Sequence, residues 1–466
     1  TLTTSARFDT AQAANSTGIL NVTGGTLNMG SQFQGANGGN TGENSQVNVS
    51  GGALNVGAGG GPFFVASRGT GTLTVSDDGT VSCGTLDISR NAQGGAFASV
   101  GEVDLDGGTL MATLVTNVSA NAQTGNTPAA TFYFNGGTLV AKSGAKTMFF
   151  QGCVSGIICP ITTIVQAGGA VIDDGGNTIT LGEPLQHDRA LGIVPDGGLT
   201  KLDSGTLNLI TTNSYTGETF VNGGVLALNG MASISNSSMI SISSGAILDA
   251  SVHSDGALTI ANGQTLTGNG TVKGNITIAS GATLAPGGSL NTLIFNDNLT
   301  LSGGSTTLVE ISGSPAANDS AQVAGNFILN GTLVITNDGV NSLNAGDRFK
   351  LFSAGSYSGA FTNIQPVVPQ PGLRWDVSEL TNGILKIAAA PPPVIGKISI
   401  AGTNLIFSGT NAPANETYWL LSSTNLDLPL TNWTVVSTNN FDRNGGFDLT
   451  NPVGKSSSQM FYLLQL

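Results

Sequence analysis

The chain has 466 residues, of which 68 are glycine and only 9% are charged, and its formal net charge is −13 at pH 7. Nucleic acids and anionic membranes are bound by clustered lysine and arginine, so this composition argues against both as partners. The sequence has no apolar run of about 18 residues, and we expect no membrane-spanning segment. Thr1 has neither a methionine nor a leader before it, which indicates that the N-terminus arises by processing of a longer product.

A four-residue phrase, Gly-Gly-small-Leu, recurs along the chain. Clear copies begin at Gly24, Gly51, Gly107, Gly136 and Gly223, and looser copies continue to residues 330–335. Each copy places a glycine-containing turn before a short strand in which apolar and polar residues alternate. The copies are about 27 to 32 residues apart at first and about 18 to 21 residues apart later.

This period fits one coil of a β-solenoid. A single coil cannot bury its apolar side chains, whereas stacked coils align Leu, Val and Ile into one continuous interior. Thr, Ser and Asn suit the outward positions, where they can form ladders from coil to coil. We therefore predict an all-β rod with about 16 coils over roughly the first 390 residues. A β-sandwich of antiparallel hairpins is the alternative that the same alternation allows.

Residues 207–230 read LNLITTNSYTGETFVNGGVLALNG. This stretch resembles the autotransporter-associated β-strand repeat, also called the passenger-associated transport repeat, and the resemblance is specific over about residues 200–312. The family pattern Asn-x-Tyr-x-Gly-x-Thr-x-Val-Asn-Gly-Gly-x-Leu is met by Asn213, Tyr215, Gly217, Thr219, Val221, Asn222, Gly223, Gly224 and Leu226. The resemblance implies a right-handed parallel β-helix on a secreted or surface-displayed bacterial protein, acting in adhesion or as a structural stalk.

The composition changes toward the end of the chain. Residues 346–388 resemble the module that closes such repeat regions, so we assign residues 1–345 to the solenoid and 346–388 to a closing β module. The proline-rich stretch at 389–394 is predicted to be a linker. Residues 395–466 resemble the small C-terminal β domain of such proteins, a sandwich of about six or seven strands. Its aromatic residues are predicted to form the core, or alternatively a platform on which a sugar ring stacks: Tyr418, Trp419 and Trp433.

Three cysteines occur in the chain. Cys153 and Cys159 lie six residues apart in GCVSGIICP, and a loop of that length can close as a disulfide in an oxidising compartment. The secreted class that the resemblance implies favours this pairing, with Cys83 unpaired. Buried free thiols are the alternative.

Two acid pairs are weak candidates for calcium binding. Asp104 and Asp106 alternate along a predicted strand and therefore share one face. Asp173 and Asp174 lie in the turn sequence DDGGN, where a solvated corner is the competing interpretation.

The densest polar cluster is GEPLQHDR, residues 182–189, which interrupts the repeat and contains Glu183 and His187. A loop that carries histidine is the first place to look for catalytic residues. The alternative is a surface loop that is held by ion pairs among its own charged side chains. His253 has no neighbour in the sequence of catalytic type. Two histidines and three cysteines form no strong zinc signature, and no glycine-rich stretch precedes a helix. We therefore predict no enzymatic activity and no cofactor, and a polysaccharide-degrading β-helix is the least favoured interpretation.

The predicted function is structural. The ends of a solenoid expose unpaired backbone groups, and the repeat starts soon after the N-terminus without a visible cap. We expect an extracellular rod that assembles head to tail with copies of itself into a surface filament. The alternative is a monomeric stalk or adhesin that binds glycans or other components of a cell surface or extracellular matrix. In either case the protein is expected outside a bacterial cell or on its surface.

Overall fold

The structure, a computed structural model, describes most of the chain: residues 1–38, 42–90, 99–117, 129–152, 159–288, 290–313, 316–338, 342–370, 372–391, 394–410, 417–442, 445–452 and 459–465. Its regular elements are β-strands, apart from three short 3₁₀ turns: η1 (Arg189–Leu191), η2 (Leu380–Asn382) and η3 (Leu430–Asn432). The all-β prediction is therefore confirmed. Within the described residues, no helix has both the length and the apolar character that crossing a membrane requires.

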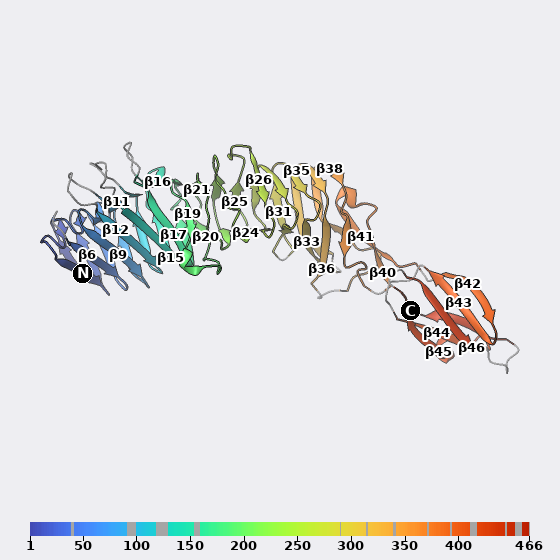
Figure 1. Ribbon diagram of the computed structural model, residues 1–466. Helices are drawn as coiled ribbons and strands as arrows, with labels where there is room; N and C mark the ends of the chain where they lie inside the picture. The colour runs from blue at the N-terminus through green and yellow to red at the C-terminus, as the bar shows by residue number, and fades with distance from the viewer. Residues whose placement is uncertain are drawn as a thin grey trace. The chain divides into compact units, whose positions relative to one another are not determined.

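The chain forms two compact units. The first contains residues 1–309, 319–333 and 353–362, and the second contains residues 310–318, 334–352 and 363–466. In the first unit, strands from successive coils stack in parallel (Figure 1). This unit is a parallel β-solenoid with about 12 turns. The predicted solenoid is confirmed, and the predicted number of coils is too high.

The coils of the first unit contribute strands to three rows. The first row contains β3 (Thr17–Val22), β6 (Asn44–Val49), β9 (Thr70–Ser76), β12 (Val100–Asp106), β15 (Ala129–Ala141), β17 (Ile161–Asp173) and β19 (Leu185–His187). The second row contains β1 (Leu2–Thr4), β4 (Thr26–Met29), β7 (Ala53–Val56), β10 (Thr80–Ser82), β13 (Thr109–Ala112), the later parts of β15 and β17, β20 (Leu199–Leu202), β22 (Thr219–Val221), β24 (Met239–Ile242), β27 (Thr265–Gly268), β30 (Thr283–Pro286) and β33 (Thr306–Ser312).

The third row runs alongside them and contains β2 (Phe8–Asp9), β5 (Phe33–Gln34), β8 (Phe63–Ala66), β11 (Thr85–Ser89), β14 (Leu114–Thr116), β16 (Met148–Gln151), β18 (Thr178–Leu181), β21 (Thr206–Leu209), β23 (Val225–Leu228), β25 (Ile247–Asp249), β28 (Thr271–Lys273), β31 (Thr292–Phe295) and β35 (Ser320–Leu329). Alternation along each strand turns one set of side chains inward, and stacking buries that set completely. In the first row Leu73 and Val103 face each other from consecutive coils, and both are fully buried.

Outward side chains form the predicted ladders. The amide Nδ2 of Asn48 donates to Oδ1 of Asn21 at 2.8 Å, and Asn55 donates to Asn28 in the same way at 2.9 Å. Both bonds join residues 27 apart, so one early coil consumes 27 residues. Such long coils explain why about 12 turns, rather than about 16, fill this part of the chain.

The first row stops at β19. At the same place in the chain order, strands start again at β26 (Ala257–Ile260), which pairs with β29 (Asn275–Ile278) and then β32 (Leu299–Leu301), and these three strands belong to the same sheet as the third row. For two coils the segments 210–218 and 229–238 take the place of the first row in the chain order without forming extended strands. The stretch from β19 to β26 is therefore an interruption of the first row. The polar sequence GEPLQHDR lies at its beginning, as the sequence suggested.

The second unit contains three small antiparallel sheets. The first is formed by β37 (Arg348–Lys350), β41 (Ile384–Ala389) and β40 (Leu373–Asp376). The other two are β42 (Val394–Ala401), β43 (Asn404–Thr410) and β46 (Phe447–Pro452), and β45 (Thr434–Asn440), β44 (Thr417–Ser423) and β47 (Phe461–Gln465). Phe407 of one sheet and Tyr418 of the other belong to the same hydrophobic cluster, so these two sheets share a core.

Candidate functional site at the interruption of the first row

Asn213 joins three consecutive coils at the interruption. Its side chain is almost fully buried, and its Oδ1 accepts the backbone N–H of Leu185 at 2.9 Å. Its Nδ2 donates to the carbonyl oxygens of Thr211 and Ser233, at 3.0 and 3.1 Å. Buried backbone groups need partners. The carboxamide therefore supplies hydrogen bonds that a ladder of strands would otherwise provide.

Tyr215 and Thr219 place hydroxyl groups in the interior. Tyr215 is 1% exposed, and its hydroxyl lies 2.7 Å from Oγ1 of Thr219. Thr219 in turn donates to Oγ of Ser237 at 2.9 Å, and Ser237 donates to the carbonyl oxygen of Met239 at 3.0 Å. Burial raises the pKa of Tyr215, so the phenol stays neutral. This chain of hydroxyls links the interiors of neighbouring coils.

Two glycines of the motif permit close contact between coils. A Cβ at Gly217 would lie 2.3 Å from the carbonyl oxygen of Asp196. Gly224 has φ of 56°, and a Cβ there would lie 2.2 Å from the carbonyl oxygen of Gly205. Side chains larger than hydrogen are therefore excluded at both positions. Two further motif residues point into the core and are fully buried: Val221 and Leu226.

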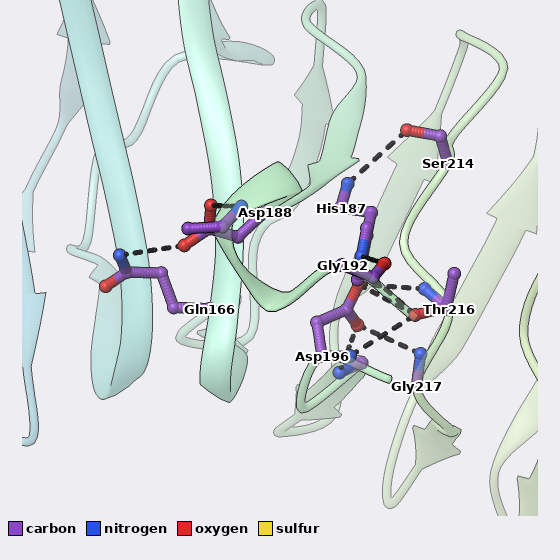
Figure 2. Close-up of polar contacts among 10 residues, drawn as sticks. Gln166, His187, Asp188, Gly192, Asp196, Ser214, Thr216 and Gly217 are labelled. Carbon is purple, nitrogen blue, oxygen red and sulfur yellow. Dashed lines mark hydrogen bonds and ion pairs between the residues drawn. The ribbon is translucent and has the colours of Figure 1, made fainter. Parts of the chain in front are cut away.

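His187 and Asp196 close the loop that follows β19, as Figure 2 shows. His187 Nδ1 lies 2.8 Å from Asp196 Oδ2, and His187 Nε2 lies 3.2 Å from the carbonyl oxygen of Gly192. Both neighbours are acceptors, so the ring serves them best as an imidazolium ion. The hydrogen bond to Asp196 raises the pKa of His187 accordingly. We call His187, Asp196 and the groups bonded to them the histidine latch.

The carboxylate of Asp196 is the centre of this latch. Its side chain is fully buried, and it accepts the N–H groups of Gly198, Thr216 and Gly217, each at 2.9 Å. Burial alone would raise the pKa of Asp196, but these backbone bonds and the bond from His187 outweigh it and hold the pKa below its usual value. Asp196 was not among the candidates taken from the sequence. It joins the loop after β19 to the motif of the next coil.

The latch lacks the geometry of a catalytic triad, although a serine lies beside it. The Oγ of Ser214 accepts the backbone N–H of His187 at 3.4 Å and does not contact the ring (Figure 2). A general base needs a free ring nitrogen, and both nitrogens of His187 are engaged. Glu183 is used elsewhere, because its Oε1 accepts the N–H of Gly152 at 2.9 Å. The arrangement fits a device that holds coils together.

The passenger-associated-transport-repeat family model matches residues 199–228, which span β20 to β23. The chain carries a passenger-associated-transport repeat. The resemblance taken from residues 207–230 is thereby confirmed. Every motif residue described above belongs to this repeat, and the repeat forms part of two adjacent coils of the solenoid.

The chain is also similar to the Adhesin BmaC autotransporter of Brucella suis biovar 1 (strain 1330). The two sequences are 28% identical over 236 residues, which is 47% of this chain and 6% of the relative. The matched region thus corresponds to a small part of a much longer protein.

Lys201 of the repeat pairs with Asp174, one of the acids predicted as a weak calcium site. Carboxylate oxygens of Asp173, Asp174 and Asp203 lie within 4.8 Å of one another. The ammonium group of Lys201 forms a fully buried ion pair with Asp174 and donates to carbonyl oxygens on its own chain segment: Leu202 at 3.2 Å, Asp203 at 2.7 Å and Gly205 at 3.1 Å. The ammonium group thus balances the charge of Asp174. Calcium binding at Asp173 and Asp174 stays a prediction.

Asp104 and Asp106 share the outward face of β12, as expected from their spacing. Asp104 Oδ2 accepts the hydroxyl of Thr74 at 3.5 Å, whereas Asp106 Oδ1 accepts Nδ2 of Asn135 at 2.8 Å. The two carboxylates therefore bond to neighbouring coils on opposite sides. Burial, followed by the charge of Glu102, raises the pKa of Asp104 to about 6.

The cysteines lie outside the repeat. Cys83 is a free, buried thiol, and burial raises its pKa to about 12. Cys159 is buried and disulfide-bonded. Cys153 lies outside the described residues, so its pairing with Cys159 stays a prediction.

The aromatic residues of the second unit do not gather on one surface. Tyr418 is 1% exposed and stacks on Phe441 in the core, with ring centroids 4.4 Å apart. Its neighbour Trp419 is 37% exposed, because adjacent residues of a strand face opposite sides. The indole N–H of Trp433 donates to the carbonyl oxygen of Leu428 at 3.1 Å. Tyr418 therefore has the core position that the sequence favoured.

Proposed function

We propose that this chain is a structural passenger segment of a bacterial surface protein, a solenoid that displays other parts of the protein away from the cell. The observation that carries this proposal is how the repeat motif is used. Asn213, Gly217 and Thr219 each join one coil to the next, and the hydroxyl of Tyr215 contacts Thr219 within its own coil. The latch around His187 also joins neighbouring coils. The motif residues thus hold stacked coils together, and this is what a protein needs when its role is to form a continuous rod.

The outward face supports the same proposal. At several coils neutral amides on this face bond to the neighbouring coil, as Asn48 does to Asn21 and Asn298 does to Asn275, both at 2.8 Å. Uncharged side-chain ladders keep their strength across a wide range of salt concentration, because only charges are screened. Such a surface suits a protein exposed to the outside medium.

Surface display is tested by placing a short epitope tag in the turn at Gly24, where a Cβ added to the glycine would meet no atom within 4 Å. Antibody should label intact cells, and protease added outside should remove the tag. A tagged cytoplasmic protein of the same cells is the control and should stay protected. Labelling that needs cell lysis would contradict the proposal.

The role of the motif in display is tested separately with Asn213→Ala. Loss of the buried carboxamide leaves the N–H of Leu185 without its partner, and the carbonyl oxygens of Thr211 and Ser233 each lose one of two hydrogen bonds and keep the bond from a backbone N–H. The amount of intact protein on the cell should therefore fall. Asn262→Ala removes an exposed asparagine from the same unit and is the matched control. Equal display of both variants would show that the motif is dispensable for stacking.

Head-to-tail assembly is the second candidate function. Among the described strands, β3 pairs with β6 alone, and Ile19 on β3 is 58% exposed. Leu2 of β1 is 64% exposed in the same first coils. An edge strand with exposed apolar side chains pairs readily with another strand. A second copy of the solenoid supplies such a strand, and so does a preceding segment of a longer protein.

Electron microscopy of the natively processed protein separates these two sources. Regular fibres with an axial repeat close to the length of one molecule would support assembly. Single particles at high protein concentration would rule assembly out and favour the passenger or adhesin alone.

A further inference from the structure

A pocket of about 300 Å³ opens in the wall of the solenoid beside β26. It lies in the first unit and is separate from the histidine latch. Its floor is apolar and includes the partly exposed Ala257 and Leu258 of β26. Its rim is polar and includes Ser233, Ser235, His253 and Asp255.

The pocket exists because two adjacent coils have unequal lengths between two fixed joints. At the first joint the N–H of Ser254 donates to the carbonyl oxygen of Gly230 at 2.7 Å. At the second, the side-chain Nε2 of Gln264 donates to the carbonyl oxygen of Ile234 at 3.1 Å. Three residues separate the joints on one coil and nine on the other. The longer segment bows away from the shorter one, and the gap between them is closed at both ends.

A tight turn shapes the rim of the pocket. The N–H of Gly256 donates to the carbonyl oxygen of His253 at 2.9 Å, and Gly256 has φ of 65°. The carboxylate of Asp255 contacts Nδ1 of His253 at 2.6 Å and accepts the N–H of Ala257 at 3.0 Å. The contact of Nδ1 with the carboxylate orients the ring of His253.

The rim therefore offers donors and acceptors close together. The hydroxyl of Ser233 donates to Oγ of Ser235 at 3.1 Å, and the Asp255 side chain is 66% exposed. No lysine or arginine is among the residues that line the pocket. A phosphate or carboxylate would meet Asp255 without a compensating cation, so an anionic ligand is disfavoured.

The closed ends also exclude an extended peptide, because a strand added beside β26 would have to pass through both joints. The space is at the lower limit of known ligand pockets, which span about 300 to 1,000 Å³. A compact ligand with one apolar face and several hydroxyl groups satisfies both the floor and the rim.

We propose that this pocket binds one pyranose ring of a neutral sugar, with the carbon–hydrogen face of the ring on Ala257 and Leu258 and its hydroxyls toward Ser233, Ser235, His253 and Asp255. The inference goes beyond the structural function, since a solenoid can stack without a ligand. Sugar binding is tested on purified protein, so its result does not depend on whether the protein is displayed on the cell surface.

Binding is measured on the full chain by saturation-transfer NMR and calorimetry. The neutral probes are the methyl glycosides of glucose, galactose, mannose and N-acetylglucosamine, and the anionic probes are glucose 6-phosphate and N-acetylneuraminic acid. We expect saturable 1:1 binding of at least one neutral probe, with Kd of the order of millimolar for a ligand of this size. Failure of every neutral probe, or equal or tighter binding of an anionic probe, would overturn the proposal.

Two substitutions locate the binding. Ser235→Trp fills the mouth of the pocket and should weaken binding at least about tenfold, whereas Ser238→Trp places the same side chain at an exposed position three residues away and should leave Kd unchanged. Asp255→Asn removes the charged acceptor and releases His253, and should weaken binding by about fivefold or more. Unchanged thermal unfolding shows that each variant is folded. Wild-type affinity in a folded Ser235→Trp variant would place the sugar elsewhere and refute the assignment.

Discussion

Replacing Lys201 with methionine should destabilise the coils around the repeat strongly. The ammonium group pairs with Asp174, and both side chains are completely buried. It also bonds three carbonyl oxygens of its own segment. Methionine matches the length of lysine but leaves the carboxylate buried without a counter-charge. Breaking a buried pair in this way costs about 3–5 kcal/mol.

The assay is native-state hydrogen exchange at Gly176 and Gly205, whose N–H groups donate to Asp174 Oδ1 at 2.9 and 2.8 Å. A repeat protein opens locally, so these amides report the affected coils better than a global melting temperature. A loss of about 3–5 kcal/mol corresponds to exchange faster by roughly a hundredfold to several thousandfold, since about 1.4 kcal/mol is a factor of ten. The matched control is Lys273→Met, because its partner Asp249 is 3.8 Å away and the lysine is 36% exposed. An exposed pair contributes about 1 kcal/mol or less.

The double variant Asp174→Asn with Lys201→Met separates charge from packing. Asparagine keeps the Oδ1 acceptor for both glycine amides and removes the unpaired charge. Exchange should therefore return most of the way toward the wild-type rate. Two results would refute the reasoning: exchange in Lys201→Met within tenfold of wild type, or a double variant no better protected than the single one.

The remaining predictions concern the latch, the motif glycine and the buried thiol. The pKa of His187 is raised, so the stability that His187 contributes to the loop is complete below pH 6.5 and is lost as pH rises through the raised pKa. The pKa of Asp196 is lowered, so the stability that Asp196 contributes is complete above pH 3.8 and is lost as pH falls through the lowered pKa. Protection of the loop amides from hydrogen exchange should therefore be greatest between pH 3.8 and 6.5. In His187→Gln this protection should no longer fall at high pH and should still fall at low pH. Gly217→Ala should lower stability by about 1–3 kcal/mol in denaturant unfolding, because its Cβ has no space, whereas Gly24→Ala, with no atom within 4 Å, should not. Native protein treated with iodoacetamide at pH 8 should leave Cys83 unlabelled by mass spectrometry, since its pKa is about 12 and it is buried; labelling without denaturant would contradict its burial.

The fold was accessible from the sequence because its signals are local. A glycine turn followed by an alternating strand recurs once or more in every coil, and each copy needs information from only a few residues. The number of coils was not accessible in the same way. It depends on how many residues each coil consumes, and the bonded pairs Asn21–Asn48 and Asn222–Ser243 lie 27 and 21 residues apart within one solenoid.

The polar contacts were harder to predict because stacking register creates them. Asp196 sits in an ordinary turn sequence, and its partners Thr216 and Gly217 lie 20 and 21 residues further along the chain. Only the alignment of two coils makes them neighbours. His253 was predicted to lack a catalytic-type partner, yet Asp255 lies 2.6 Å from it. On a strand, the side chains of His253 and Asp255 would lie on the same face without touching. The turn at Gly256 instead brings the two side chains into contact.

The direction of the backbone hydrogen bonds determines how the solenoid responds to pulling. The bonds between coils run along the stacking axis, so tension applied along that axis acts on all coil interfaces in series, and the end coil yields first because it is bonded on one side only. A coil of 27 residues that peels away releases roughly 90 Å of extended chain while the rod loses one layer of about 4.8 Å. A tether built in this way lengthens by steps under a sustained load, and each step relieves the force on the coils that remain.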